Sequence, residues 1–210
     1  GQKMSKSLGN SPDPLDSMDK YGVDALRVSI LMIAPQGLDI LFSEDRIEHG
    51  RNFMNKLWNS ARFILMNIET EIDEFIDKPK RDELDPTDLW ILSKLNSTIN
   101  NVNKAYETYK MNEAIKTVYN FVYSDFCDWY IEFSKTRLYG TDEKSRKVAL
   151  NVSIYCIRTI LKLLHPYTPY ITEELWTYFS TEKEEMIINE SWPIANSNSG
   201  DLIFSSEISL

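Results

Sequence analysis

The apolar residues of this chain recur three and four positions apart, and this spacing constrains the fold more than any other feature. The most regular run lies in residues 43–68, where Ser43 and two following acids predict a helix start. One side of that helix collects Ile47, Met54, Leu57, Trp58, Ala61, Ile64, Leu65 and Ile68. The chain has only 7 glycines against 11 Tyr, 9 Phe and 5 Trp, which favours packed helices over turn-rich sheet. We therefore expect an all-α helical bundle.

Further helices are expected at the same spacing. They cover about 16–33 after a cap at Asp16 or Ser17, 86–109 after Asp85, 111–138, 142–164 after Asp142, and 169–179. The aromatic residues of the helix over 111–138 are interpreted as core: Tyr119, Phe121, Tyr123, Phe126, Trp129, Tyr130 and Phe133. Asp125 and Asp128 lie among these rings with no histidine nearby, which favours structural partners over an acid–base pair. An extended strip is expected over 187–193.

Charge and reactive residues exclude several classes of function. A net charge of −9 argues against a protein that binds polyanions over its whole surface, so any nucleic-acid contact must belong to one face. Cys127 and Cys156 have no C-x-x-C partner and are expected to be buried free thiols. His49 and His165 have no ligand-like neighbours, so no metal site is expected. The sequence contains neither a signal peptide nor an apolar run of membrane length, and no membrane contact is expected.

The helix predicted over 43–68 also has a polar side. Residues 49–68 contain no Asp or Glu, although the chain is acidic. This side collects Arg51, Asn52, Asn55, Lys56, Asn59, Arg62, Phe63 and Met66. Arg and Lys bind phosphate, amides read base edges and an outward Phe stacks on an unpaired base, so this is a candidate RNA-binding face. The alternative is that Phe63 and Met66 pack on a neighbouring element while the asparagines are merely solvated.

The first ten residues, Gly-Gln-Lys-Met-Ser-Lys-Ser-Leu-Gly-Asn, hold two lysines and two serines, and no acid occurs before Asp13. Such a loop offers ammonium and backbone N–H groups, which suit a polyphosphate. By composition alone, a solvated lysine-serine loop is favoured over a polyphosphate site. Farther along, Arg27 has two open interpretations, a surface ion pair or a contact with RNA backbone.

These runs resemble a known family. The run Lys3-Met4-Ser5-Lys6-Ser7 matches the KMSKS signature of class I aminoacyl-tRNA synthetases. Its continuation to Asp24-Ala25-Leu26-Arg27 resembles the enzymes for valine, isoleucine and leucine. The runs that resemble the valyl-tRNA synthetases most are 51–59 with Arg62-Phe63, and 125–130; the segment 165–176 also matches these enzymes. The resemblance covers residues 1–193.

The resemblance implies an enzyme that activates its amino acid with ATP and Mg²⁺ and transfers it to tRNA. Lys6 and, as an assistant, Lys3 are implied as catalytic, and residues Lys3, Met4, Ser5, Lys6 and Ser7 as ATP-binding. The family's His-x-Gly-His motif and its editing domain are not found in this sequence. We therefore expect a C-terminal part of a longer enzyme, which alone forms no adenylate and binds neither ATP nor a metal.

The expected organisation follows the resemblance. Residues 1–42 are the KMSKS loop and a stem-contact region, 43–193 a class Ia anticodon-binding bundle, and 194–210 a poorly ordered tail or linker. The implied tRNA-binding residues are Arg51, Asn52, Asn55, Lys56, Asn59, Arg62 and Phe63. The implied partners are a valine tRNA and the catalytic and editing domains, in a cytoplasmic monomer. Two alternatives remain open: the isoleucine or leucine equivalent, and a helical protein-interaction module.

Overall fold

The computed structural model describes residues 3–9, 11–34, 37, 40, 42–69, 81–180 and 186–195, and the regular elements within these ranges are helical. The α-helices are α1 (Pro14–Tyr21), α2 (Val23–Ile33), α3 (Glu44–Leu65), α4 (Pro86–Glu107), α5 (Met111–Asn120), α6 (Ile131–Leu138), α7 (Glu143–Leu164) and α8 (Pro169–Phe179). The shorter elements are the 3-10 turns η1 (Lys6–Leu8), η3 (Arg81–Glu83) and η5 (Ile187–Asn189), and the π-helix η4 (Phe121–Tyr130). The expected all-α fold is confirmed.

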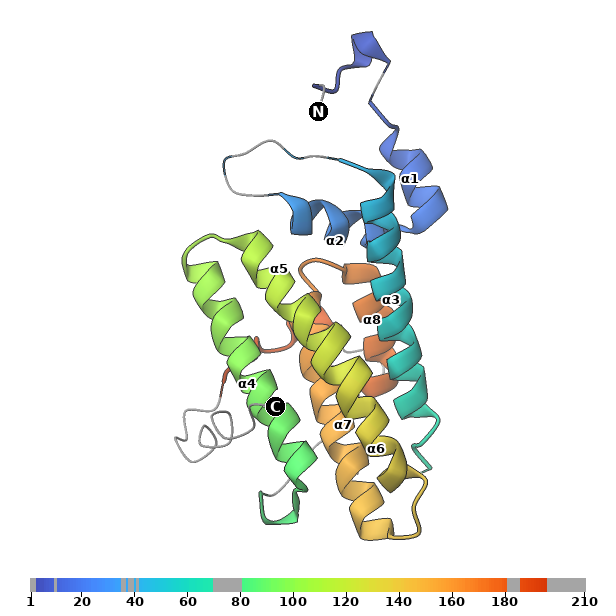
Figure 1. Cartoon of the computed structure of the whole chain (residues 1–210), viewed down its shortest axis with the longest axis vertical. Helices are drawn as coiled ribbons and strands as arrows, with labels where there is room; N and C mark the ends of the chain where they lie inside the picture. The colour runs from blue at the N-terminus through green and yellow to red at the C-terminus, as the bar shows by residue number, and fades with distance from the viewer. Residues whose placement is uncertain are drawn as a thin grey trace.

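The long helices form an elongated bundle (Figure 1). The helices α3, α4 and α7 run lengthwise, together with the continuous rod of α5, η4 and α6. The central helix is α7, which packs against α3, α4, α5, α6 and α8. At one end α1 and α2 cover α3, and residues 3–9 extend beyond them. The largest fully buried side chains, led by Trp176, Tyr130 and Phe53, lie where these helices meet.

Side-chain caps fix two helix starts where the sequence predicted them, whereas Ser43 precedes α3 without a side-chain cap hydrogen bond. The Thr87 N–H donates to Asp85 Oδ1 over 2.8 Å, and the Asp85 N–H donates back to Asp88 Oδ2 over 3.1 Å. This reciprocal capping box begins α4. The Ser145 N–H donates to Asp142 Oδ1 over 3.1 Å and begins α7. These caps supply acceptors for N–H groups that have no partner within the helix.

The single helix predicted over 16–33 is wrong. Gly22 interrupts it with φ +92°, a conformation that residues with a Cβ rarely adopt, and separates α1 from α2. The first cap is also earlier than predicted, because the Leu15 N–H donates to Asp13 Oδ1 over 2.9 Å. The chain therefore turns between α1 and α2 before it reaches α3.

The core stripe of the α5–η4–α6 rod differs from the prediction, because its middle is wound as a π-helix. Buried residues recur at every fourth position: Val118, Val122, Phe126, Tyr130, Ser134 and Leu138. A π turn holds more residues than an α turn, so positions four apart stay on one line. Trp129 and Phe133, which were predicted to be core, are instead 55% and 43% exposed. Their rings lie 5.6 Å apart on the surface of the rod.

Other predictions have mixed outcomes. Cys127 and Cys156 are free and buried, as expected. The strip over 187–193 begins with η5 rather than in extended form, and Trp192 donates its Nε1–H to Asn103 over 2.8 Å. The predicted tail lies outside the described residues from 196 onward. Within the described ranges, no helix is both long and apolar enough to span a bilayer, and no group of three or more His, Cys, Asp or Glu side chains is placed to hold a metal ion.

Candidate nucleic-acid interface

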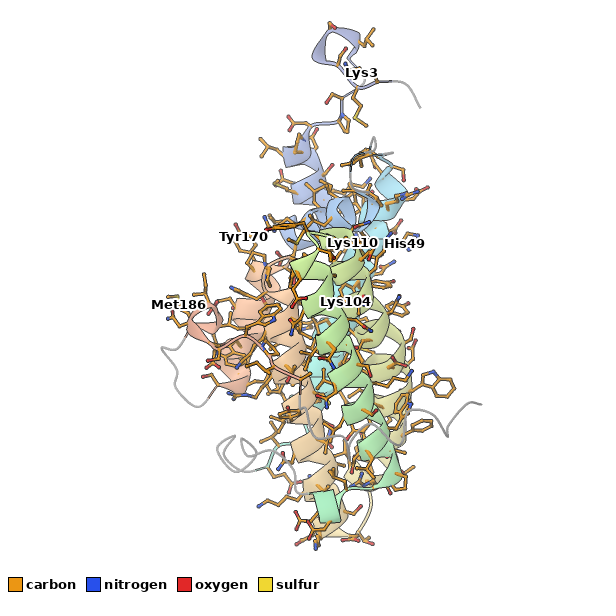
Figure 2. The ribbon with its side chains drawn as sticks, turned by 90° about the vertical axis from the view of Figure 1, so that its left-hand side faces the viewer. Lys3, His49, Lys104, Lys110, Tyr170 and Met186 are labelled. Atoms are coloured by element: carbon orange, nitrogen blue, oxygen red, sulfur yellow. The ribbon has the colours of Figure 1, made fainter. Side chains whose placement is uncertain are left out.

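The opening lysine segment, residues 3–9, forms a short exposed turn. The Ser5 hydroxyl accepts from the Leu8 N–H over 3.2 Å and lies 3.1 Å from the Ser7 hydroxyl, which stabilises η1. Lys3, Met4 and Ser7 are exposed and Ser5 is half-buried. In Figure 2 Lys3 lies at the tip of the molecule, far from Met186. The residues with the implied ATP-binding role therefore follow one another in one turn, where solvent can reach Lys3.

Helix α2 is fastened to the turn between α7 and α8 and to the first turn of α8. The Asp24 carboxylate accepts the N–H of Ile171 over 2.7 Å and that of Tyr170 over 3.5 Å. Arg27 donates to the carbonyl oxygens of Tyr167 over 3.0 Å and Pro166 over 3.3 Å. Burial raises the pKa of Asp24, and the two N–H donors offset only part of this effect. The hydrogen-bond partners of Arg27 are backbone carbonyls rather than a surface acid, while its contact with RNA backbone stays a prediction.

The polar side of α3 is largely open to solvent. Five of the seven residues predicted to bind tRNA are exposed there: Arg51, Asn52, Asn55, Asn59 and Arg62. Met66 continues this side with 73% of its surface exposed. Trp58 was predicted to be core but is 40% exposed, whereas Phe53, which was not assigned to the core, is fully buried. We call the five exposed residues the α3 outer face. It presents amides and two guanidinium groups without a carboxylate in its own helix segment.

The other two predicted residues, Lys56 and Phe63, turn toward the rod. The ammonium of Lys56 pairs with Asp128 and lies 3.3 Å from the ring centroid of Tyr123. Phe63 is half-buried and meets the ring of Tyr139 edge-on, with centroids 6.3 Å apart. The predicted residues thus divide into an exposed face and a border with the rod. The alternative interpretation, in which Phe63 and Met66 pack on a neighbouring element, is correct for Phe63 but not for Met66.

The two carboxylates of η4 are structural, as interpreted from the sequence. Asp128 neutralises Lys56, and Asp125 lies 3.7 Å from the ammonium of Lys94. Burial raises the pKa of Asp125, and the charge of Lys94 opposes this effect. Each of the two carboxylates pairs with a lysine of a neighbouring helix, α3 or α4, so the pair has no acid–base arrangement.

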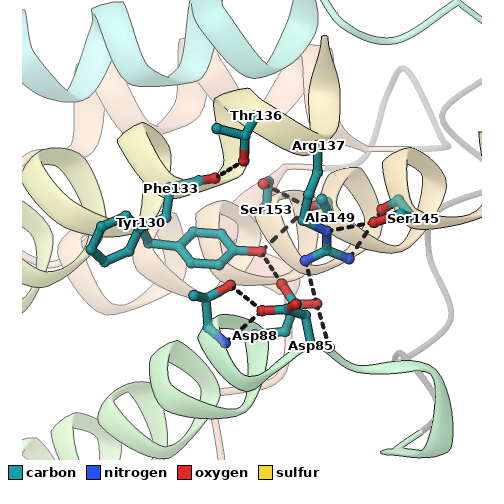
Figure 3. Close-up of polar contacts among 10 residues, drawn as sticks. Asp85, Asp88, Tyr130, Phe133, Thr136, Arg137, Ser145, Ala149 and Ser153 are labelled. Atoms are coloured by element: carbon teal, nitrogen blue, oxygen red, sulfur yellow. Dashed lines mark hydrogen bonds and ion pairs between the residues drawn. The ribbon is translucent and has the colours of Figure 1, made fainter. Parts of the chain in front are cut away.

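A buried polar network, shown in Figure 3, fastens the rod to α4 and α7. The Arg137 guanidinium donates to Asp88 Oδ2 over 2.7 Å, and the Tyr130 hydroxyl donates to Asp88 Oδ1 over 2.8 Å. Arg137 also donates to the Ser145 hydroxyl and carbonyl over 2.8 and 3.0 Å. The network joins α4, the rod and α7, and burial raises the pKa of Tyr130 far above its usual range. No sequence prediction identified it, because its members are separated by up to 57 positions along the chain, from Asp88 to Ser145.

Two family profiles match different parts of the chain. The profile described as class I tRNA synthetases (I, L, M and V) matches residues 1–43, and the profile of the anticodon-binding domain of tRNA ligase matches residues 88–208. Among curated proteins, the valine–tRNA ligase of Listeria innocua is 43% identical over 201 residues, and that of Clostridium perfringens is 46% identical over 194 residues. These alignments cover 96% and 92% of this chain. The chain spans 22% of the length of each of these relatives.

Solved structures share the fold. A complex of LeuRS from Agrobacterium radiobacter K84 with tRNA and LeuAMS has a TM-score of 0.71 at 24% identity, and covers 96% of this chain and 23% of its own. Methionyl-tRNA synthetase of Mycobacterium tuberculosis has a TM-score of 0.70 at 23% identity, and covers 84% of this chain and 35% of its own. The helical arrangement and the profile over residues 88–208 lead to one assignment: the chain belongs to the anticodon-binding domain family of tRNA ligases.

Proposed function

We propose that this chain serves as the anticodon-binding part, with an adjoining KMSKS loop, of a valine–tRNA ligase. The observation that carries the proposal is the identity of 43–46% to valine–tRNA ligases over nearly the whole chain. In this proposal residues 1–42 adjoin the catalytic domain, 43–193 bind the anticodon arm of a valine tRNA, and 194–210 are a linker. The whole enzyme is a cytoplasmic monomer that joins valine to tRNA with ATP.

The α3 outer face binds the RNA in this proposal. Its two arginines meet phosphates, and the amides of Asn52, Asn55 and Asn59 reach base edges. Exposure of these five side chains supports the role, because they can bind without opening the bundle. Lys56 and Phe63 join from the border with the rod. The tRNA in the related LeuRS complex makes RNA a suitable partner for a chain of this fold.

The lysine segment contributes to catalysis in the complete enzyme. Ammonium groups of Lys3 and Lys6 oppose the charge that grows on the phosphates of ATP as pyrophosphate leaves. The exposed position of Lys3 at the tip of the molecule fits contact with another domain. Residues 3–9 contain no carboxylate, so the Mg²⁺ that accompanies ATP, which prefers oxygen ligands, takes them from ATP and other residues.

Binding of labelled tRNA tests the RNA-binding role. Asn59→Ala and Arg62→Ala should each weaken binding of a valine tRNA to the 210-residue chain, by about tenfold in fluorescence anisotropy. Asn101→Ala and Lys104→Ala remove an exposed amide and an exposed cation from α4 and serve as matched controls with unchanged binding. Asn59 is preferred to Phe63 as a target, because truncating Phe63 also removes its packing on Tyr139.

Two results would contradict the proposal. Equal binding of all four variants would remove the α3 outer face from the interface. Equal binding of a valine tRNA and of isoleucine or leucine tRNAs, or tighter binding of either, would assign the chain to another member of the family.

The lysine role is tested in the complete ligase. Lys6→Ala should lower the rate of valine adenylate formation far more than it weakens valine binding, because the charge that Lys6 opposes develops only in the transition state. Pyrophosphate exchange measured against valine concentration separates the two effects. Equal losses in rate and in valine affinity would exclude the role.

A further inference from the structure

A cavity of about 370 Å³ lies at the junction of α2, α3 and α5, near the end of the bundle that carries the lysine segment. Met32 and Ile33 of α2 form an apolar wall, and Tyr119 of α5 forms another. Arg46 and His49 of α3 lie at its edge, and both are exposed. Figure 2 shows His49 on α3 near this end of the bundle, far from Met186.

The helices α2 and α3 approach closely at Gly50, which lines the cavity. A Cβ built on Gly50 would lie 2.3 Å from the Ser29 hydroxyl and 2.5 Å from the Ala25 carbonyl oxygen. The Ser29 hydroxyl also donates to the Arg46 carbonyl over 2.9 Å, so the backbone of α3 is fixed to α2 at the floor of the cavity. The walls therefore belong to rigid helices rather than to a loop.

Arg46 gives the edge of the cavity a group that can bind an anion. Within the described part of the chain, the Arg46 guanidinium has no ion-pair partner, and His49 makes no hydrogen bond. The guanidinium supplies positive charge at the edge of the cavity in a chain with a net charge of −9. A nucleotide combines the two chemistries that the cavity offers, an aromatic base for the apolar wall and a phosphate for Arg46. Tyr119 belongs to that wall, and its ring also packs on Phe53 and Tyr123.

The cavity also continues the border of α3 with the rod. His49, Lys56 and Phe63 are seven positions apart and lie on one side of the helix, about 10 Å from each other along its axis. Tyr119 beside His49 stacks on Tyr123, with ring centroids 5.4 Å apart, and Lys56 covers Tyr123. Aromatic rings and cations thus follow one another from the cavity down to Phe63.

We propose that this cavity holds one unpaired nucleotide of the bound RNA, with its base between Tyr119 and Met32 and its phosphate on Arg46. This is a second contact, separate from the α3 outer face, and it rests on the proposed binding of tRNA. It anchors the RNA near α2, whereas Asn59 and Arg62 bind it toward the other end of α3.

Abasic substitution, combined with protein variants, tests this inference. A set of valine tRNA transcripts, each lacking the base of one unpaired nucleotide, is titrated against the 210-residue chain. One transcript should bind the unmodified chain about tenfold more weakly than intact tRNA. Removal of the same base should have little effect on binding to the Arg46→Gln variant, which lacks the phosphate contact, or to the Ile33→Phe variant, in which the cavity is filled. Lys104→Ala, on α4, should keep the full effect.

The outcomes separate the two proposals. If intact tRNA binds in an anticodon-dependent manner but no abasic position is coupled to Arg46→Gln and Ile33→Phe, the cavity holds no nucleotide and the proposed function stands. If removal of the same base also has little effect on binding to the Asn59→Ala variant, the base lies on the α3 outer face and the cavity proposal is wrong. If no tRNA binds, both proposals are overturned.

Discussion

At the residue scale, the buried pair of Asp88 and Arg137 is the most consequential polar contact. The side chain of Asp88 is fully buried and that of Arg137 is only 14% exposed, so solvent can replace neither partner. Asp88→Asn should lower the free energy of unfolding by about 3 kcal/mol, because it leaves a buried guanidinium without its counter-charge. Urea unfolding measures this change.

The control for this prediction is Glu132→Gln, which breaks an exposed pair with Lys135 on the same rod. Exposed pairs contribute about 1 kcal/mol at most, so this variant should unfold almost as the parent chain does. Equal losses in the two variants would show that burial does not set the strength of the Asp88 contact.

His165 should make stability depend on pH near neutrality. Burial lowers the pKa of His165, and its Nδ1 lies 2.8 Å from the Thr172 hydroxyl, while Glu173 and Asp24 oppose the shift. The unfolded chain therefore takes up a proton at a pH where the folded chain does not, and stability falls as pH drops below about 6.5. Urea unfolding at pH 7.5 and 6.0 should show this fall in the parent chain and a smaller one in His165→Gln.

The matched control is His49→Gln, which removes the other histidine from an exposed position on α3. This variant should keep the fall in stability between the two pH values. A parent chain whose stability does not change over this interval would exclude the effect of His165. Asp24 cannot cause this fall, because a carboxyl group with a raised pKa changes stability in the opposite direction as pH falls.

At the element scale, the close contact between α2 and α3 should reverse the usual stabilising effect of replacing a helical glycine with alanine. Replacing glycine with alanine inside a helix usually stabilises it by about 1 kcal/mol. At Gly50 the new Cβ would lie 2.5 Å from the Ala25 carbonyl oxygen, so the two helices must separate. Gly50→Ala should therefore destabilise the chain by about 1–3 kcal/mol in thermal or urea unfolding.

Asn52→Ala on the α3 outer face is the comparison, because it improves helix propensity without touching α2. It should be neutral or slightly stabilising. A Gly50→Ala chain that is as stable as Asn52→Ala would mean that α2 can move away from α3 at little cost.

The sequence predicted the long helices well, because each buries a stripe with the spacing of an α-helix. Starts at Asp85 and Asp142 were also predictable, since a capping carboxylate acts within three residues of its own position. Trp129 and Phe133 were misplaced because the dense run of aromatic residues was assigned to the core as a whole, whereas the rod buries the line through Val122, Phe126 and Tyr130.

The candidate site was predictable only in part. Exposure of Arg51 and Asn59 follows from their angle on α3, which the sequence gives. The inward turn of Lys56 depends on Asp128, 72 positions away, and the contacts of Arg27 are carbonyl groups about 140 positions away. Backbone acceptors have no sequence signature, so a charged residue that binds them is easily taken for a surface cation.

At the scale of the whole molecule, an acidic chain that binds RNA through one face should show a shallow salt dependence. The α3 outer face has two cations, Arg51 and Arg62, while Lys56 is already neutralised by Asp128. With roughly 0.7–0.9 counterions released per phosphate contact, the slope of log K against log salt should be about −2. Anisotropy titrations between low and moderate salt measure it.

A cation at the cavity would add to this slope. If Arg46 also meets a phosphate, the slope should approach −3, and Arg46→Gln should return it to about −2. A slope steeper than about −6 would require many more phosphate contacts than these arginines provide, and would place the main RNA interface on another face.

The fastening of α2 to the turn between α7 and α8 has a consequence for how this chain can vary in evolution. Asp24 and Arg27 hydrogen-bond to main-chain atoms of residues 166–171, namely two carbonyl oxygens in the turn and two N–H groups at the start of α8. Substitutions in that turn leave these atoms in place, whereas inserting or deleting a residue displaces all of them. Selection therefore acts on the length of the turn more than on the identity of its side chains, and related sequences should align across it without gaps.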